Sequence, residues 1–264
     1  MNSRARIFAL LANIGPALLV MALMIGAWYW ISYFELSDSQ RFLLPPPQDV
    51  FRLGVLDAGN FGEILLALWA TTKVALVGLG LSMGIGIVLA VLMVQTRALE
   101  RAIYPYAVFL QTVPILAIVP VIGFWFGFNF QSRVIVCILF SLFPIITNTL
   151  YGLQEISAPQ RDLFRLHGAS RWVQLLKLQL PAALPSIFNG FRISAGLSVI
   201  GAIVGDFFFR QGEIGIGRLI DLYAQRLMTE QLFTAVMMSS VLGLLVFWLF
   251  GITGNLATRH WREA

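Results

Sequence analysis

Long apolar stretches separated by short polar segments dominate this chain. Six of them reach the roughly 20 residues that a helix needs to cross a bilayer, at 12–34, 64–95, 103–127, 133–154, 185–209 and 231–257. The second is longer than a bilayer requires, so we expect its first turns, around Glu63 to Lys73, to project beyond the hydrocarbon or the helix to tilt. The pattern predicts an all-α transmembrane fold of six helices in a single domain over residues 1–264.

Composition supports a membrane protein. Of 264 residues, 58% are hydrophobic and 12% are charged, with a mean hydropathy of +0.82, whereas soluble domains carry about 25% charged residues. The net charge of +5 fits basic loops better than nucleic-acid binding, so no nucleic acid is expected as a partner. The one cysteine, Cys137, lies in an apolar stretch and excludes a disulfide framework, and His167 and His260 match no zinc spacing.

The distribution of Lys and Arg predicts the orientation. With the N-terminus in the cytoplasm, ten of the 18 fall on cytoplasmic segments and six outside, Arg133 among the latter, while Lys73 and Arg192 lie within spans. This asymmetry follows the positive-inside rule and predicts that both termini are cytoplasmic. Arg4 and Arg6 before an apolar run also resemble a signal peptide, but the run is long and lacks a small-residue cleavage pattern, which favours an uncleaved first span.

The segment 155–184 is the longest polar-containing stretch between two apolar blocks. Within it the sequence DLFRLHGASRWVQLLKLQLP predicts two short helices, Asp162–His167 and Ser170–Gln179. Gly168 can take the backbone angles of a sharp corner, and Pro181 is expected to end the second helix. A helical hairpin this polar, placed between membrane spans on the cytoplasmic side, is a candidate docking surface for a soluble partner.

Glycine, proline and polar residues within the spans leave alternatives open. The pairs Gly80/Gly84 and Gly201/Gly205 form small-xxx-small faces, which serve close packing or let helices slide. Prolines in the third and fourth spans predict bends. Thr147 and Asn148 line a translocation pathway or bond neighbouring helices. Near the ends of the fifth span, Arg192 can snorkel, and Asp206 faces water or contacts a partner or gate.

The hairpin carries a specific resemblance. Its residues match the pattern E-A-A, three residues, G, nine residues, I, one residue, L-P, with Asp162-Leu163-Phe164 in place of E-A-A, then Gly168, Leu178 and Leu180-Pro181. The chain is similar in this respect to the inner-membrane permease subunits of binding-protein-dependent ABC importers with the type I fold. In that family the loop holds the coupling helix, so the resemblance implies that an ATPase subunit docks on Asp162, Leu163, Phe164, Arg165, His167, Gly168, Ala169, Ser170, Leu178, Leu180 and Pro181.

Supporting similarities point to the nitrate/sulfonate/taurine branch of that family. They are the proline-rich segment Leu44–Val50, for which three prolines favour an extended path and exclude helix, the stretch 112–128, Gly190-Phe191-Arg192, Gly205-Asp206, and the glycine-rich element 212–220, expected to be a re-entrant or surface turn. The branch handles small anions such as nitrate, sulfonates and taurine, or vitamin-related heterocycles. The resemblance covers residues from about 44 to the C-terminus.

The resemblance implies a bacterial inner-membrane transport subunit that is not an enzyme. The sequence holds no G-x-x-x-x-G-K-[ST] motif, so ATP and Mg would bind a separate subunit and this chain would bind no cofactor or metal. The implied partners are two ABC ATPase subunits, a second permease subunit, identical in a homodimer, and an extracytoplasmic solute-binding protein. The alternative is a stand-alone secondary transporter or channel, which would need coupling charges within the membrane.

Overall fold

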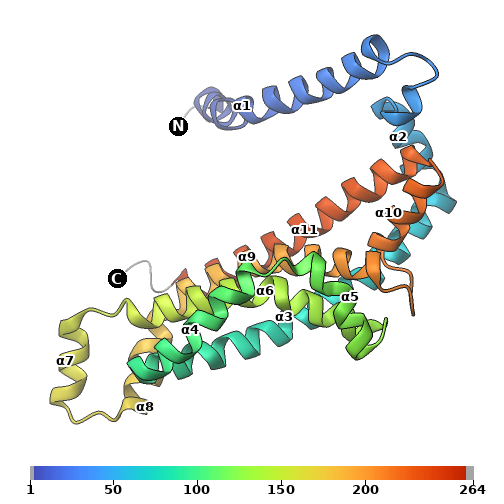
Figure 1. The fold of residues 1–264 in the computed structure, drawn as a ribbon. Helices are drawn as coiled ribbons and strands as arrows, with labels where there is room; N and C mark the ends of the chain where they lie inside the picture. Colours follow the sequence, from blue (N-terminus) through green and yellow to red (C-terminus); the bar gives the residue numbers. More distant parts are fainter. Residues whose placement is uncertain (1–2, 260–264) are drawn as a thin grey trace. The chain divides into compact units, whose positions relative to one another are not determined.

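The computed structural model describes residues 3–259, with side chains from residue 15 onward. The predictions made above for Arg4, Arg6 and His260 concern side chains outside the described part of the structure. Within the described residues the chain is helical and contains no strand. The α-helices (Figure 1) are α1 (Ser3–Trp30), α2 (Pro47–Phe51), α3 (Ala58–Gln95), α4 (Arg97–Thr112), α5 (Ile115–Phe126), α6 (Phe130–Gln154), α7 (Ala158–Leu166), α8 (Arg171–Gln174), α9 (Leu180–Phe208), α10 (Ile216–Gln225) and α11 (Thr229–Thr258).

Five helical segments in the described part of the chain are long and apolar enough to cross a membrane. They are Gly15–Glu35, Ala58–Gln95, Phe130–Gln154, Arg171–Phe208 and Thr229–Thr258, and five of the six predicted spans fall on them. The predicted span 103–127 falls on α4 and α5, which meet at an angle of 102°. The break lies at Val113, whose backbone is extended (φ −63°, ψ 131°) because a residue before proline is disfavoured in the helical region.

Two expectations about proline are wrong. Leu44–Val50 is not extended throughout, because Pro47 begins α2, where a proline at the first helical position lacks only an N–H that has no partner anyway. Pro181 does not end a helix, because it lies in the first turn of α9. A π-helical turn, Leu175–Gln179, joins α8 to α9, and this widened turn lets the helix continue past the missing N–H of proline.

The chain divides into two compact units, Met1–Glu63 with Leu222–Val236, and Ile64–Asp221 with Met237–Ala264. In the first, the end of α1 contacts the segment that follows it. The Trp28 indole N–H donates to the Pro45 carbonyl at 3.0 Å and the Ser32 hydroxyl to the Leu44 carbonyl at 2.9 Å. Further along, the Tyr223 hydroxyl donates to Glu63 at 3.1 Å.

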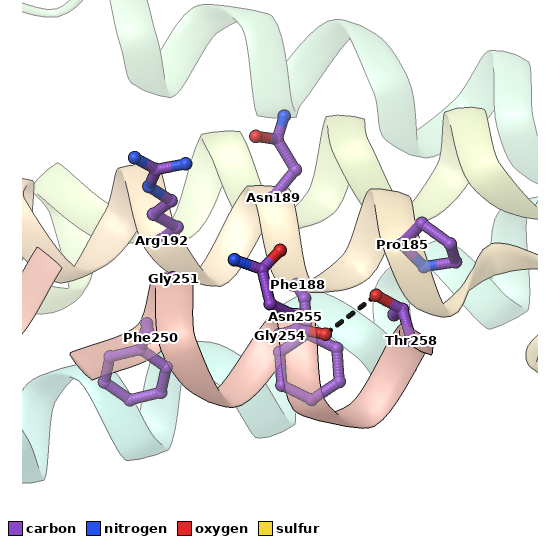
Figure 2. Close-up of a pocket in the computed structure, with 9 residues that line it drawn as sticks. All are labelled: Pro185, Phe188, Asn189, Arg192, Phe250, Gly251, Gly254, Asn255 and Thr258. Atoms are coloured by element: carbon purple, nitrogen blue, oxygen red, sulfur yellow. Dashed lines mark hydrogen bonds between the residues drawn. The ribbon is translucent and has the colours of Figure 1, made fainter. Parts of the chain in front are cut away.

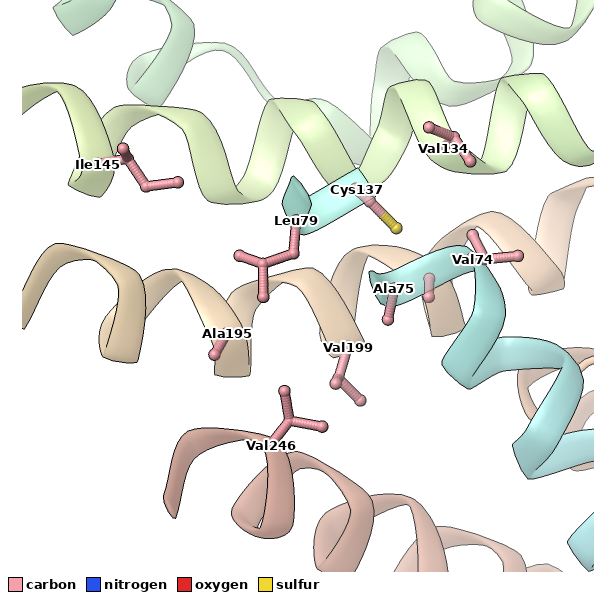
Figure 3. Close-up of a cluster of buried hydrophobic side chains, with 10 residues drawn as sticks. Val74, Ala75, Leu79, Val134, Cys137, Ile145, Ala195, Val199 and Val246 are labelled. Atoms are coloured by element: carbon pink, nitrogen blue, oxygen red, sulfur yellow. The ribbon is translucent and has the colours of Figure 1, made fainter. Parts of the chain in front are cut away.

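The second unit is built on α6 packed against α9. A buried cluster, shown in Figure 3, joins α3, α6, α9 and α11 through side chains of modest size: Val74, Ala75, Leu79, Val134, Cys137, Ile145, Ala195, Val199, Ala202 and Val246. Gly201 permits this packing, since a Cβ added there would lie 2.9 Å from the Cα of Cys137. Buried hydroxyls add hydrogen bonds between helices: Ser82 to Ser141 at 2.8 Å, and Ser194 to the Ser141 carbonyl at 2.6 Å.

The two predicted glycine faces behave differently. Gly201 and Gly205 both pack closely against α6, with added Cβ atoms at 2.9 Å from Cys137 and 3.1 Å from Arg133. At Gly80 and Gly84 an added Cβ would meet nothing within 4 Å. Within the second unit, therefore, the Gly201/Gly205 face serves close packing, whereas the Gly80/Gly84 face has no close neighbour among the described residues of that unit.

Candidate functional site

The loop between α6 and α9 turns at Gly168. Its φ of +67° is in the left-handed region, which glycine adopts without the steric cost of a Cβ. The Gly168 N–H bonds to the Arg165 carbonyl at 2.9 Å, and the Ala169 N–H bonds to the Phe164 carbonyl at 3.0 Å. These two bonds form a Schellman motif that ends α7. The predicted corner is confirmed, although α7 spans Ala158–Leu166 rather than Asp162–His167.

The second arm of the loop is capped at its start and continuous with the membrane helix at its end. Ser170 is the N-cap of α8, and its hydroxyl accepts the Val173 N–H at 3.4 Å. The chain then runs through the π-helical turn into α9 without leaving helical geometry. The second predicted helix, Ser170–Gln179, is therefore wrong as an isolated element: it is the first part of a helical run from Arg171 to Phe208.

Apolar side chains on this loop divide into an anchoring set and an exposed set. Leu175 is 2% exposed and, with half-buried Leu180, packs into a buried cluster of α3, α4, α6 and α9. The exposed set comprises Leu163, Leu166, Trp172, Val173 and Leu176. Leu166 is 85% exposed and Trp172 is 63% exposed. Figure 1 shows α7 and α8 projecting beyond the ends of α6 and α9, so these exposed side chains lie on a projecting, anchored element.

The sequence-predicted docking residues are not all exposed in this arrangement. Asp162, Leu163, Arg165, His167, Gly168 and Ser170 are exposed, while Phe164, Ala169, Leu178, Leu180 and Pro181 are half-buried. Sequence reasoning missed Leu166, Trp172 and Leu176. The spacing of three residues between Leu163 and Leu166, and of four between Trp172 and Leu176, places each pair on one helical face. That spacing is the signal that could have identified them.

A polar cleft of about 550 Å³ lies beside the loop. It is lined by the end of α3, the start of α4, and residues of α7, α8 and the turn that follows: Val94, Gln95, Thr96, Arg97, Arg161, Arg165, Arg171, Gln174 and Gln179. The Arg171 guanidinium donates to the Gln95 carbonyl at 3.4 Å, and Arg165 pairs with Asp162 at 3.7 Å. The lining thus contains four guanidinium groups and no carboxylate.

At the opposite ends of α6 and α9, Asp206 is fully buried, so the expectation that it faces water is wrong. Its carboxylate lies 3.1 Å from the Arg133 guanidinium and accepts the Thr71 hydroxyl at 2.6 Å. The backbone N–H of Gly217 also donates to it. Arg133 is also buried, at 2% exposure within α6, so its charge is offset inside the protein rather than by water.

Arg133 also fixes the segment that links α9 to α10. Its guanidinium donates to the carbonyls of Phe209 at 2.7 Å, Gln211 at 3.0 Å and Glu213 at 2.9 Å. The Thr71 hydroxyl accepts the Ile216 N–H at 2.8 Å. The predicted turn at 212–220 is therefore a turn only up to α10, which begins at Ile216. The buried pair holds the turn against α3, α6 and α9.

The remaining predicted pathway residues lie on α6 and α9. Asn148 accepts the amide of Asn189 at 3.0 Å, which joins the two helices, while the Thr147 hydroxyl donates to the Phe143 carbonyl of its own helix at 3.0 Å. Arg192 is exposed and lies 4.2 Å from the centroid of the Phe247 ring.

Asn189 and Arg192 also border a small pocket of about 100 Å³ between α9 and α11, shown in Figure 2. The pocket is lined by Pro185, Phe188, Asn189, Arg192, Phe250, Gly251, Gly254, Asn255 and Thr258. The polar groups of α6 and α9 thus meet at one side of the helix pair. Asp206, by contrast, lies in a separate buried network.

Helices of membrane-spanning length and a projecting, anchored loop define a polytopic membrane protein. The chain matches, over residues 82–260, the family described as binding-protein-dependent transport system inner membrane component. It is 36% identical over 213 residues to the formylaminopyrimidine transport permease protein ThiX of Halalkalibacterium halodurans, covering 79% of this chain and 82% of that protein. The chain belongs to this family of inner-membrane components of binding-protein-dependent transport systems, and the resemblance stated from the sequence is confirmed.

Other relatives and two solved structures are consistent with this family assignment. The riboflavin transport system permease protein RibX of Chloroflexus aurantiacus is 32% identical over 92% of this chain and 90% of its own length. The bicarbonate transport system permease protein CmpB of Synechococcus elongatus is 33% identical over 82% of this chain and 75% of its own. Two solved structures share the fold: an amino acid ABC transporter (TM-score 0.57, 16% identity, 76% and 94% covered) and a bacterial alginate ABC transporter (TM-score 0.59, 15%, 95% and 97%).

Proposed function

We propose that the chain forms the translocation pathway of an ATP-driven importer and that the loop between α6 and α9 docks on a separate ATPase subunit. The observation that carries this proposal is the combination of anchoring and exposure in the loop. Leu175 is buried in the helix bundle, while Leu166 and Trp172 are exposed on a projecting element. Leu166 lies outside the candidate spans, and Trp172 lies in the first turn of the 38-residue run Arg171–Phe208, which is longer than the roughly 20 residues that a bilayer requires. Exposed apolar side chains at such positions are typical of protein–protein contacts, and a helix continuous with α9 can transmit movement into the bundle.

The complete transporter in this proposal contains two copies of the chain, two ATPase subunits that bind ATP and Mg, and an extracytoplasmic solute-binding protein. The distribution of Lys and Arg supports cytoplasmic termini and a cytoplasmic loop, on the side where ATP is available. The solute is a small anion or a vitamin-related heterocycle. The names of relatives support this range, since they include a formylaminopyrimidine, a riboflavin and a bicarbonate system.

For the pathway we propose Thr147, Asn148 and Arg192. Asn148 of α6 accepts a hydrogen bond from Asn189 of α9, and Arg192 lies three residues further along α9. Arg192 contacts the Phe247 ring and pairs with no carboxylate among the described residues. A charged side chain within a span normally faces a water-filled cavity or a bundle interior. Asp206 would influence gating only indirectly, through Arg133 and the turn that it holds.

The docking proposal is tested by introducing a charge at an exposed loop position. We expect Leu166→Asp to weaken association with the ATPase that co-purifies with the wild-type chain by at least about tenfold, because a carboxylate would be buried in an apolar contact. Leu56→Asp is the matched control, since Leu56 is similarly exposed (65%) and lies outside the loop. Pull-down of the ATPase with each variant measures the difference.

Two results would contradict the proposal. In the first, no P-loop ATPase co-purifies with the wild-type chain, which would favour a stand-alone transporter or channel. In the second, both leucine variants retain the ATPase equally, which would place the contact elsewhere. The solute is then identified from the co-purifying binding protein, by measuring which compounds raise its melting temperature.

A further inference from the structure

The arginine cleft beside the loop concentrates positive charge from separate elements. Arg97 belongs to the start of α4, Arg161 and Arg165 to α7, and Arg171 to α8, and all four line one cavity of about 550 Å³. Like charges gathered around one cavity repel each other unless anions offset them. The cleft therefore has the charge and the size for a phosphate-bearing ligand.

Carboxylates of the protein do not supply the missing negative charge. Of the four arginines that line the cleft, only Arg165 pairs with a carboxylate of the described residues, that of Asp162, at 3.7 Å on the exposed surface of α7. Arg171 donates to a backbone carbonyl. The Nε of Arg161 is buried and has no acceptor, although buried polar groups in proteins are nearly always hydrogen-bonded. An acceptor from outside the chain would satisfy this nitrogen.

The position of the cleft indicates the kind of anion. Gln95 is the last residue of α3, a candidate membrane span, and spans end near the lipid headgroups, so we expect the cleft at that depth. On α4 the face that starts with Arg97 continues through Arg101 to Tyr104 and Val108, all four exposed, at the i, i+4, i+7 and i+11 spacing of one helical face. This face changes from cationic to apolar with distance from the cleft, as a phospholipid changes from headgroup to acyl chain.

We propose that the cleft formed by Arg97, Arg161, Arg165 and Arg171 binds the phosphate of an anionic phospholipid, whose chains lie along the apolar part of α4. Clusters of arginine at the ends of membrane helices bind anionic headgroups in this way, and guanidinium groups match phosphate oxygens in geometry. Because the cleft joins α7 to the α3–α4 corner, a bound lipid fixes the first arm of the loop to the helix bundle. This site does not include Leu166 or Trp172, the residues that carry the docking proposal, although Arg165 belongs both to the cleft and to the predicted docking residues.

The test measures lipid binding to the purified full-length chain in detergent by native mass spectrometry. Phosphatidylglycerol, phosphatidylcholine and inorganic phosphate are the probes. We expect phosphatidylglycerol to bind more tightly than phosphatidylcholine, and Arg97→Gln or Arg161→Gln each to weaken phosphatidylglycerol binding about fivefold. Arg226→Gln is the matched control, because Arg226 is exposed and lies outside the cleft, and it should leave binding unchanged.

Arg161→Lys keeps the charge but loses the planar fork, so an intermediate affinity is expected. Thermal unfolding of each variant establishes that it is folded. Equal binding of phosphatidylcholine, or equal affinities in the wild type and both glutamine variants, would overturn the proposal. Inorganic phosphate that displaces phosphatidylglycerol at similar concentration would also overturn it, in favour of a soluble anion.

Discussion

The Arg133–Asp206 pair is the strongest test of the packing described for the second unit. Asp206→Asn keeps the shape of the side chain and removes its charge, which leaves the buried guanidinium of Arg133 without a counter-charge. At the observed 3.1 Å and an effective dielectric constant of about 20, the attraction between two unit charges is about 5 kcal/mol. Breaking a buried pair in other proteins costs about 3–5 kcal/mol, so we expect a loss of that size.

Two assays follow the loss. The thermal unfolding temperature of the detergent-solubilised protein should fall on the order of 10 °C. Trypsin should cleave faster after Arg210, because the turn from Phe209 to Ile216 loses the carboxylate that orients Arg133 beneath it. Asp38→Asn is the control: Asp38 pairs with Arg41 at 2.8 Å on the surface, and exposed pairs contribute little to stability.

A double variant separates charge pairing from general damage. In a double-mutant cycle with Arg133→Met and Asp206→Leu, the double variant should lose less stability than the sum of the two single variants, because each single variant leaves one buried charge unpaired. The loss of the Arg133 donors to the Phe209, Gln211 and Glu213 carbonyls is common to Arg133→Met and the double variant, so it does not enter this comparison. If Asp206→Asn unfolds at the wild-type temperature and resists trypsin equally, the pair does not hold the turn. The account of α9 and α10 given above would then be refuted.

Two further predictions concern glycine. Gly201→Val should destabilise the protein by about 1–3 kcal/mol, because its Cβ would lie 2.9 Å from the Cα of Cys137. Gly80→Val is the control: an added Cβ there meets nothing within 4 Å, so the unfolding temperature of the protein in detergent should not change. Equal effects of the two variants would contradict the packing of α6 on α9. In Gly168→Ala the new Cβ would meet no atom within 4 Å, but the alanine would have to adopt the left-handed φ of +67°. This backbone strain should destabilise the corner locally by about 1–2 kcal/mol. Hydrogen exchange at residues 164–170 should rise without a change in the unfolding temperature, and unchanged exchange would argue against the Schellman corner.

The sequence was sufficient to predict the long apolar helices and the corner of the loop, but not α2 or α10. Apolar stretches of about 20 residues are direct evidence of membrane helices, and a glycine followed by a capping serine indicates a turn between helices. The effect of each proline was harder to predict, since its consequence depends on where the neighbouring hydrogen bonds go. Pro114 breaks a span, Pro47 begins a helix, and Pro181 is accommodated by a π-helical turn.

The buried pair illustrates a different limit. Arg133 and Asp206 lie at the start of α6 and the end of α9, and the predicted topology already placed these ends on the same side of the membrane. Their opposite charges could have suggested pairing, but each residue alone was compatible with contact with water. The packing of Gly205 against Arg133, with an added Cβ at 3.1 Å, shows how closely the two helices approach beside the pair. Whether a charged residue near the end of a span faces water or is buried in an ion pair depends on contacts between residues far apart in sequence.

Uptake into proteoliposomes tests the central claim most directly. Vesicles would contain the chain with its co-purifying ATPase, the binding protein would be added outside, and ATP would be enclosed inside, with radiolabelled solute as the reporter. The account predicts uptake only when ATPase, ATP and binding protein are all present, and its loss with Leu166→Asp but not with Leu56→Asp. Solute entry into vesicles that contain this polypeptide alone would contradict the account.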